Sequence, residues 1–265
     1  MISSRRSVSP AWGWLMGFGI AGAQVIAPQF CVAAELAEIQ ERGYLIVAVK
    51  DSIRPLAYRN EFGELVGLEV DLARRLADVL LGDASAVQLL PVSNQERFPA
   101  LLNDEVDLVI ARTTVTVPRA RIVDFSLPYY LDGTALVTLD PTVQQLSDLR
   151  TANVAVLYGS TTIDALRLLL PNARLVGAES YQEALAAVAA GEVTAFAADA
   201  SVLTGWVQEN PQYRLLPTLL SGEALAIAMP RGLQYDDLRQ RVNEAIAQWQ
   251  ADGWLQERLN YWGLP

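Results

Sequence analysis

The amino-acid sequence predicts an α/β fold in two lobes, joined by a hinge that two strands cross. After residue 35, short β-rich runs alternate with helical stretches, an order typical of a sheet covered by helices. The alternation restarts near Asn153, which indicates a second sheet. Residues 132–140 and 219–226 are the expected crossings, and neither is a flexible low-complexity linker.

The first lobe is expected to comprise residues 35–138 and 223–265. Its strands are predicted at residues 44–49, 86–90, 106–110 and 224–229. A helix over 71–81 is indicated by leucines four residues apart and by a glycine that ends it: Leu72, Leu76, Leu80 and Gly82. Asn94 is expected to cap a second helix, whose inner face would be Phe98, Leu101 and Leu102. Two further helices close the chain after residue 235.

The second lobe is expected to comprise residues 139–222. A strand at 153–157 leads into a glycine turn and a helix that ends at Pro171. Ser180 and Glu183 have the spacing of a capping box, and Gly191 ends the helix that follows it. A further strand is predicted at 194–198.

Residues 1–34 have the pattern of a secretory signal peptide. Arg5 and Arg6 precede an uncharged apolar stretch at 11–26, and small residues at 32–34 suit a signal peptidase. A retained membrane anchor and a lipid attached to Cys31 are the alternatives. The signal predicts export to the periplasm.

Composition excludes several classes of function. The chain has no histidine and one cysteine, so Ser-His-Asp catalysis, Cys-His catalysis and the usual zinc sites are not expected. The formal net charge of −10 argues against nucleic acid as a partner, because phosphate contacts need clustered Lys and Arg. We expect no metal and no cofactor.

Three local patterns could together bind a zwitterion. The turn Gly159-Ser160-Thr161 follows a strand and opens a helix, where free N–H groups attract an anion. Arg119 follows another strand and could bind a carboxylate through two parallel hydrogen bonds. Asp199 ends a strand of the other lobe and could hold an ammonium group. Taken singly, each pattern is better explained by a helix cap or an exposed arginine.

From residue 36 to its end the chain resembles the periplasmic solute-binding proteins of bacterial amino-acid ABC transporters, family 3. The resemblance is carried by motifs in the family's order and spacing: residues 64–73 (ELVGLEVDLA), 114–119 (TVTVPR), 124–130 (DFSLPYY), Gly159-Ser160-Thr161 and 195–199 (AFAAD). It implies a type II periplasmic-binding-protein fold that closes around its ligand, and a non-enzymatic monomer that delivers an amino acid to a membrane permease.

The resemblance also implies a role for each matching residue. Arg119 would bind the ligand α-carboxylate, helped by Thr114 and by the N–H groups of Ser160 and Thr161. Asp199 would bind the α-ammonium, aided by a carbonyl near Ala111. The 124–130 motif and Asp71 would be structural.

Ligand specificity is predicted from residues around these motifs. Lys50 and Arg112 would suit an acidic side chain, and the alternative for both is surface solvation or an internal ion pair. Family members often stack an aromatic ring on the ligand at the positions of Ile53 and Asn94, and neither residue here is aromatic. We therefore expect glutamate or aspartate, with glutamine and asparagine as further candidates. The resemblance leaves open a periplasmic dehydratase of cyclic acids on the same fold, or the ligand-binding module of a sensor.

Overall fold

The computed structural model describes residues 35–160 and 162–265. The predicted signal peptide and Thr161 lie outside the described residues. The described chain forms two five-stranded sheets and a small three-stranded one. The prediction of an α/β fold with a second sheet is confirmed.

The first sheet has the strand order β5-β1-β6-β13-β7. Its strands are β1 (Leu45–Val49), β5 (Val87–Pro91), β6 (Leu108–Ile110), β7 (Asp124–Asp132) and β13 (Glu223–Met229). β1 pairs in parallel with β5 and β6, whereas β13 is antiparallel to β6 and β7. The carboxyl ends of the three parallel strands therefore meet at one edge, and a ligand site is expected there.

Helices cover this sheet and bury its apolar side chains. They are α1 (Leu36–Arg42), α2 (Leu68–Leu81), α3 (Arg97–Leu102), α7 (Asp236–Ala251) and α8 (Trp254–Tyr261), with short 3₁₀ helices η1 (Arg119–Arg121) and η3 (Leu233–Tyr235). Leu72, Leu76 and Leu80 are buried, as their spacing predicted. Gly67 caps α2 with φ +133°, and a Cβ there would collide with the Leu56 carbonyl, so only glycine fits.

Helix α3 differs in two details from the sequence prediction. It begins at Arg97, and Ser93 and Glu96 exchange hydrogen bonds before it, so Asn94 is not its cap. Leu102 is 52% exposed, because the short helix turns Arg97, Ala100 and Leu101 toward the interior.

A small antiparallel sheet follows β1. It consists of β2 (Ser52–Ile53), β3 (Ala57–Arg59) and β4 (Leu65–Val66). The segment between β2 and β3 carries Arg54, which contacts the second half of the molecule, as described below.

The second large sheet has the strand order β10-β9-β11-β8-β12. Its strands are β8 (Thr134–Thr138), β9 (Asn153–Leu157), β10 (Arg174–Ala178), β11 (Ala195–Asp199) and β12 (Arg214–Leu215). Its helices are η2 (Leu146–Leu149), α4 (Thr162–Leu169), α5 (Tyr181–Ala189) and α6 (Ala200–Glu209). The capping prediction for α5 is confirmed, since the Ser180 side chain accepts a hydrogen bond from Glu183 N.

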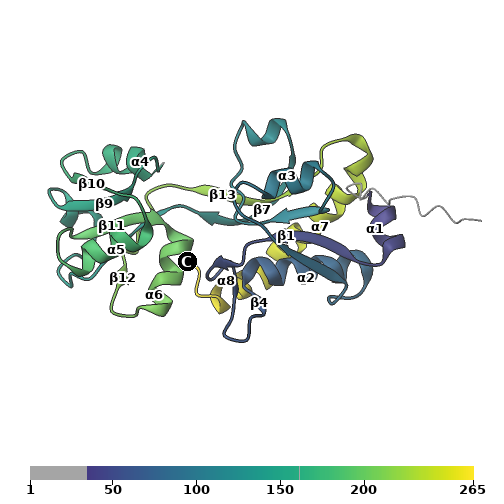
Figure 1. The fold of residues 1–265 in the computed structure, drawn as a ribbon, viewed down its shortest axis with the longest axis horizontal. Coiled ribbons are helices and arrows are strands. Elements are labelled where there is room, and N and C mark those ends of the chain that lie inside the picture. Colours follow the sequence, from purple (N-terminus) through teal and green to yellow (C-terminus); the bar gives the residue numbers. More distant parts are fainter. Residues whose placement is uncertain (1–34, 161) are drawn as a thin grey trace, which may run out of the picture. The chain divides into compact units, whose positions relative to one another are not determined.

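The chain changes sheets earlier than the sequence boundary at residue 138. β8 pairs with β11 and β12, so residues 134–138 belong to the second sheet. β7 and β13 run side by side as far as the pair Asp132 and Glu223 (Figure 1). Beyond that pair, Leu220 N donates to Thr134 O. These two adjacent crossings form the expected hinge.

The two large sheets have separate apolar cores. One is built around β1, β6, α2 and α7 and includes Trp249, and the other lies against β11 and includes Phe196.

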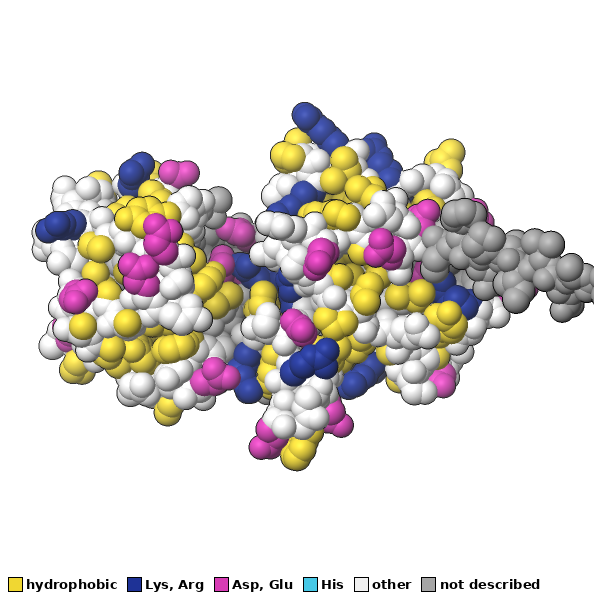
Figure 2. Space-filling view, in the orientation of Figure 1, with side chains coloured by type: hydrophobic (Ala, Val, Ile, Leu, Met, Phe, Trp, Pro, Cys, Tyr) yellow, Lys and Arg dark blue, Asp and Glu magenta, His cyan; other side chains and the backbone are white. Residues whose placement is uncertain are grey.

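Acidic and basic side chains are scattered over the face shown in Figure 2. Within the described ranges, no helix has the length and apolar character needed to span a membrane.

Candidate functional site

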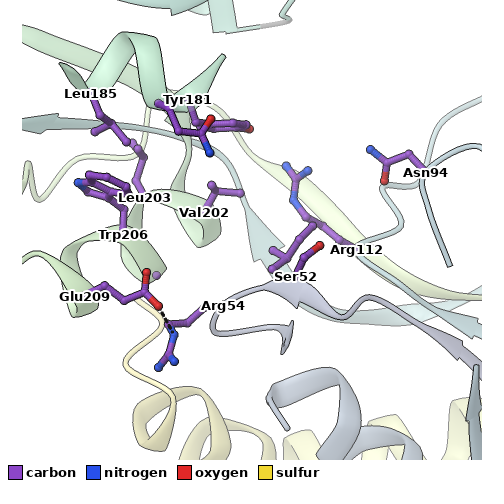
Figure 3. A pocket seen from close by; sticks show the side chains of 13 residues that line it. Ser52, Arg54, Asn94, Arg112, Tyr181, Leu185, Val202, Leu203, Trp206 and Glu209 are labelled. Carbon is purple, nitrogen blue, oxygen red and sulfur yellow. Dashed lines mark ion pairs between the residues drawn. The ribbon is translucent and has the colours of Figure 1, made fainter. Parts of the chain in front are cut away.

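A pocket of about 380 Å³ lies between loops and the small sheet of the first lobe and helices α5 and α6 of the second. α5 and α6 supply an apolar wall that includes Leu185, Val202, Leu203 and Trp206. Ser52, Asn94 and Arg112 line it from the first sheet's side (Figure 3). A mostly apolar wall with a few polar groups is typical of small-molecule sites.

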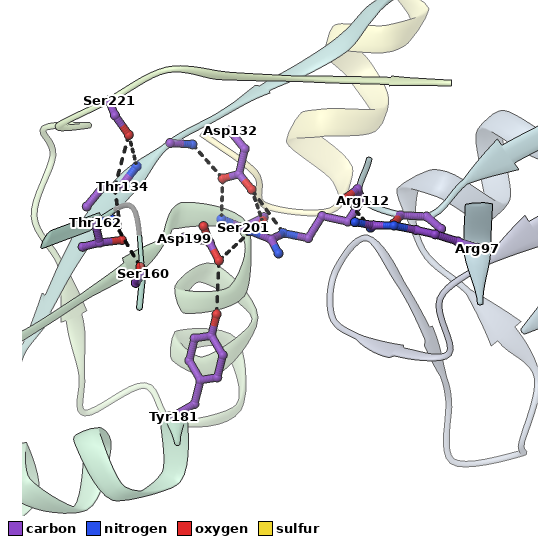
Figure 4. Close-up of polar contacts among 12 residues, drawn as sticks. Arg97, Arg112, Asp132, Thr134, Ser160, Thr162, Tyr181, Asp199, Ser201 and Ser221 are labelled. Atoms are coloured by element: carbon purple, nitrogen blue, oxygen red, sulfur yellow. Dashed lines mark hydrogen bonds and ion pairs between the residues drawn. The ribbon is translucent and has the colours of Figure 1, made fainter. Parts of the chain in front are cut away.

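An ion pair joins the two sides of this pocket. The Arg112 Nη2 lies 2.5 Å from Asp199 Oδ2, and Tyr181 donates to the same carboxylate oxygen over 3.1 Å. The Arg112 Nε lies 3.6 Å from Asp132 Oδ2. Although burial acts against it, the two aspartates raise the pKa of Arg112 above its ordinary value. In Figure 4 the Arg112 side chain lies between Arg97 and the two aspartates, and its guanidinium points toward Asp132 and Asp199. The ion-pair alternative for Arg112 therefore describes the structure.

Asp132 holds the hinge side of this pair. It is 1% exposed, and its Oδ1 accepts from Gly133 N over 2.9 Å and from Ser201 N over 3.0 Å. Its Oδ2 accepts from Ser201 Oγ over 2.6 Å. The end of β7 is thereby tied to the start of α6.

The backbone of Arg112 has the left-handed conformation, with φ +48°. This conformation costs a residue with a Cβ on the order of 1 kcal/mol. Its N–H donates to Glu69 Oε1 over 2.6 Å, and its carbonyl accepts from Arg97 Nη1 over 3.0 Å. These two bonds hold a peptide unit that glycine would occupy without strain.

Glu69 is fully buried behind Arg112. Its Oε1 also accepts from the Tyr129 hydroxyl over 2.6 Å. Burial raises the pKa of Glu69 to about 7, although the hydrogen bonds from Tyr129 and Arg112 N act in the opposite direction.

This shift predicts that Glu69 makes stability depend on pH. Its pKa is higher in the folded than in the unfolded chain, so its contribution is full below about 4.5 and is lost as the pH rises through about 7. Glu69 is expected to lower the free energy of unfolding by at most about 3 kcal/mol over this pH range, and Glu69→Gln should abolish that decrease. Urea unfolding of both proteins from pH 4.5 to 8 measures the free energy of unfolding. A constant difference between them over that range would contradict the prediction.

Thr114 and Arg119, predicted as carboxylate ligands, lie together on the first sheet's side. Arg119 Nη1 donates to the Thr114 carbonyl over 2.9 Å, and Thr114 bridges to Leu225 of β13. The Arg119 guanidinium lies 5.5 Å from the centre of the Phe98 ring, and that of Arg97 lies 5.3 Å from it. Two cations therefore gather around one ring.

The other predicted residues are placed differently. Ser160 Oγ accepts from Thr162 N over 3.2 Å, which is a capping contact, and Thr161 lies outside the described residues. The Ala111 carbonyl accepts from Arg97 over 2.8 Å instead of facing the pocket freely. Asn94 lines the pocket and is exposed.

Lys50 is 4% exposed and donates to the Val92 carbonyl over 2.9 Å. Burial, followed by repulsion from Arg97, lowers the pKa of Lys50 to about 8. Its ammonium group is thus held inside the first sheet's side and is not among the groups that line the pocket.

Sequence reasoning did not assign three residues that the fold brings to the site. Arg97 is 6% exposed, and its Nε has no hydrogen-bond partner among the described residues. Its signal was an arginine at a position of α3 that faces inward. Tyr181 and Trp206 line the pocket from α5 and α6. Their positions in these helices gave no separate signal, because aromatic residues on helices are usually core residues.

Metal binding gains no support from the described residues. Across 35–160 and 162–265, no group of three Asp, Glu, Cys or His side chains has the arrangement of a metal site. The charged groups of the site are instead paired with one another or with carbonyl groups.

Comparison with known proteins gives several relatives of similar length. The glutamine-binding protein of Geobacillus stearothermophilus is 34% identical over 195 residues, which cover 72% of this chain and 74% of that protein. The L-cystine-binding protein TcyJ of Escherichia coli K12 is 29% identical over 234 residues, which cover 86% and 85%.

Solved structures with this fold include an ancestral cationic amino acid solute-binding protein, AncCDT-1. It has 28% identity and a TM-score of 0.72 over 86% of this chain and 98% of that one. The L-cysteine solute receptor of Neisseria gonorrhoeae has 28% identity and a TM-score of 0.65, over 88% and 94%. The model of the bacterial extracellular solute-binding proteins, family 3, matches residues 45–265. This chain therefore belongs to family 3 of the bacterial extracellular solute-binding proteins.

Proposed function

We propose that this protein binds an amino acid with an acidic or amide side chain in the periplasm and delivers it to an ABC permease. The observation that carries the proposal is the ion pair between Arg112 and Asp199, which joins the two lobes beside a pocket that Arg112 and Tyr181 line. Opposite charges on facing walls match the two charges of a free amino acid. A relative named for binding glutamine supports the amide side chain, and one named for binding cystine supports only an amino acid as the ligand.

The charges around the site favour glutamate over glutamine. Arg97, Arg112 and Arg119 gather here, and within the described residues only Arg112 of the three forms ion pairs, with Asp132 and Asp199. Arg97 and Arg119 have no carboxylate partner there, and the side-chain carboxylate of a glutamate ligand would supply one.

The mechanism is hinge closure. The ligand carboxylate binds Arg119 and Thr114, and closure brings Asp199, Tyr181 and the N–H groups near Ser160 against the ligand. Water leaves the pocket as it closes, which strengthens each charged hydrogen bond. β7 and β13, which cross between the sheets together, are the segments that bend.

A thermal-shift screen of the full chain against the common amino acids tests this function, because a ligand that binds only the folded state raises Tm. We expect the largest shift with L-glutamate and a smaller one with L-glutamine. No shift with any amino acid would contradict the proposal. It would instead favour the dehydratase alternative, since one structural neighbour is a precursor of cyclohexadienyl dehydratase. A turnover assay for loss of water from cyclic acids would then follow.

Arg97 is expected to select the acidic side chain. Arg97→Gln removes a buried positive charge, so L-glutamate should lose affinity about tenfold more than L-glutamine. Isothermal titration of both ligands measures this difference. Arg121→Gln is the matched control, because Arg121 is exposed. Equal losses of affinity for the two ligands would mean that Arg97 does not select the acidic side chain.

Gly205 is expected to be needed for closure. It lies in α6, and a Cβ there would collide with the Arg54 carbonyl, while Arg54 and Glu209 form an ion pair of 2.9 Å beside it. Gly205→Val should hold the two sides apart and lower ligand affinity about tenfold, because the closed state becomes rarer. Ala189→Val is the control, since it introduces the same side chain at an exposed helical position of the same lobe. Wild-type affinity in Gly205→Val would contradict the prediction.

A further inference from the structure

Glu69 occupies an unusual place for a carboxyl group. It lies in the first turn of α2, within the 64–73 motif, and is fully buried. Its Oε2 has no hydrogen-bond partner among the described residues. A buried carboxyl group with one oxygen unpaired is costly, and the hydrogen bonds to its other oxygen offset part of that cost.

Both donors to its Oε1 belong to segments that form the site. The Tyr129 hydroxyl comes from β7, the strand that crosses to the second sheet, and the Arg112 N–H comes from the turn after β6. Each bond is 2.6 Å long. Glu69 therefore joins the crossing strand to the residue that contacts Asp199.

The carbonyl group of Arg112 is also fixed by a hydrogen bond. Arg97 donates to its carbonyl, so side chains fix both the N–H and the C=O of a residue with φ +48°. A residue other than glycine is found in this conformation when its surroundings impose it. Without the bond from Arg112 N to Glu69, the turn could relax, and the guanidinium would no longer point at Asp199.

We propose that Glu69 is a positioning residue of the ligand site, which holds the turn at Arg112 so that its guanidinium bridges to Asp199. This bridge joins the first lobe to the second. The role requires an acceptor at Glu69 Oε1 and does not require its charge. The amide of Gln would therefore serve, and a methyl group would not.

The distance between the two sides of the ligand-free chain tests the proposal. Spin labels on cysteines introduced at the exposed positions Glu61→Cys and Glu192→Cys report this distance. The natural cysteine is first replaced by Cys31→Ser, so that only the two introduced cysteines are labelled. Because no ligand is added, the result does not depend on the identity of the ligand or on the proposed function. Thermal melts first establish that each variant is folded.

A double-mutant cycle then separates positioning from general support. We expect Glu69→Ala and Arg112→Gly each to move the distribution to longer distances, and the double variant to move it no further than Arg112→Gly alone. Glu69→Gln should match the wild type, and so should Tyr129→Phe, which removes only the other donor. Where Glu69→Ala does not fold, Glu69→Asp, shorter by one methylene, takes its place in the cycle.

Three outcomes would overturn the proposal. The first is a wild-type distribution in Glu69→Ala. The second is additive shifts in the double variant, which would mean that Glu69 acts independently of Arg112. The third is a shift in Glu69→Gln as large as that in Glu69→Ala, because the acceptor alone would then not be sufficient.

Discussion

Asp199→Asn is expected to lower the affinity for L-glutamate by about 3 kcal/mol, or roughly 100-fold. The substitution removes the carboxylate proposed to bind the ligand ammonium. It also removes the nearer of the two carboxylates beside the Arg112 guanidinium, since Asp199 lies 2.5 Å and Asp132 3.6 Å from it. The lost contact to the ligand ammonium is therefore expected to account for most of the effect.

Isothermal titration of the full chain measures this loss. Asp164→Asn is the matched control, because Asp164 is an exposed aspartate on α4 of the same sheet's side. We expect the control to bind as the wild type does. Affinity within threefold of wild type in Asp199→Asn would exclude Asp199 as the ammonium partner.

Arg119→Ala is the second substitution with a large expected effect. A guanidinium has five N–H donors, and one of the groups of Arg119 is engaged by the Thr114 carbonyl at 2.9 Å. The remaining donors are proposed to bind the α-carboxylate, which all amino-acid ligands share. We expect a loss of about 3 kcal/mol for L-glutamate and L-glutamine alike.

The equal loss for both ligands distinguishes Arg119 from Arg97, whose removal is expected to affect L-glutamate more. Arg119→Lys should recover part of the affinity, because lysine keeps the charge and loses the paired hydrogen bonds. Titration with both ligands measures these effects, and Arg121→Ala is the control on the same short helix. A loss confined to L-glutamate would place Arg119 at the ligand side chain instead.

The contacts of Arg112 follow from the tertiary structure and not from the sequence pattern. From the sequence, a cation after the β6 strand had two explanations, a contact to an acidic ligand or an internal ion pair. The structure places its guanidinium 2.5 Å from Asp199, which is the internal ion pair. Asp199 and Asp132 both lie near this one guanidinium, and their distances from it set how strongly each attracts Arg112. The sequence pattern does not contain these distances.

The sequence by itself determined six strands and six helices, because the spacing of apolar residues and the glycine and serine caps are local signals; β7, β8 and β10 were not among them. Strand 153–157 and the leucine face of α2 follow from them directly. It also determined the family, because several motifs occur in order along one chain. These properties depend on neighbours within a few residues, which sequence patterns record.

Only the tertiary structure decided which charged groups meet. Lys50 was expected at the ligand and instead donates to Val92, while Arg97 was not assigned and is buried beside Arg112 and Arg119. The hydrogen bond from Arg112 N to Glu69 joins residues 43 positions apart, and Arg112 and Asp199 belong to different lobes. A charged side chain can reach several partners, and its choice depends on burial and on distances between segments remote in sequence. Packing fixes these quantities, and local patterns do not.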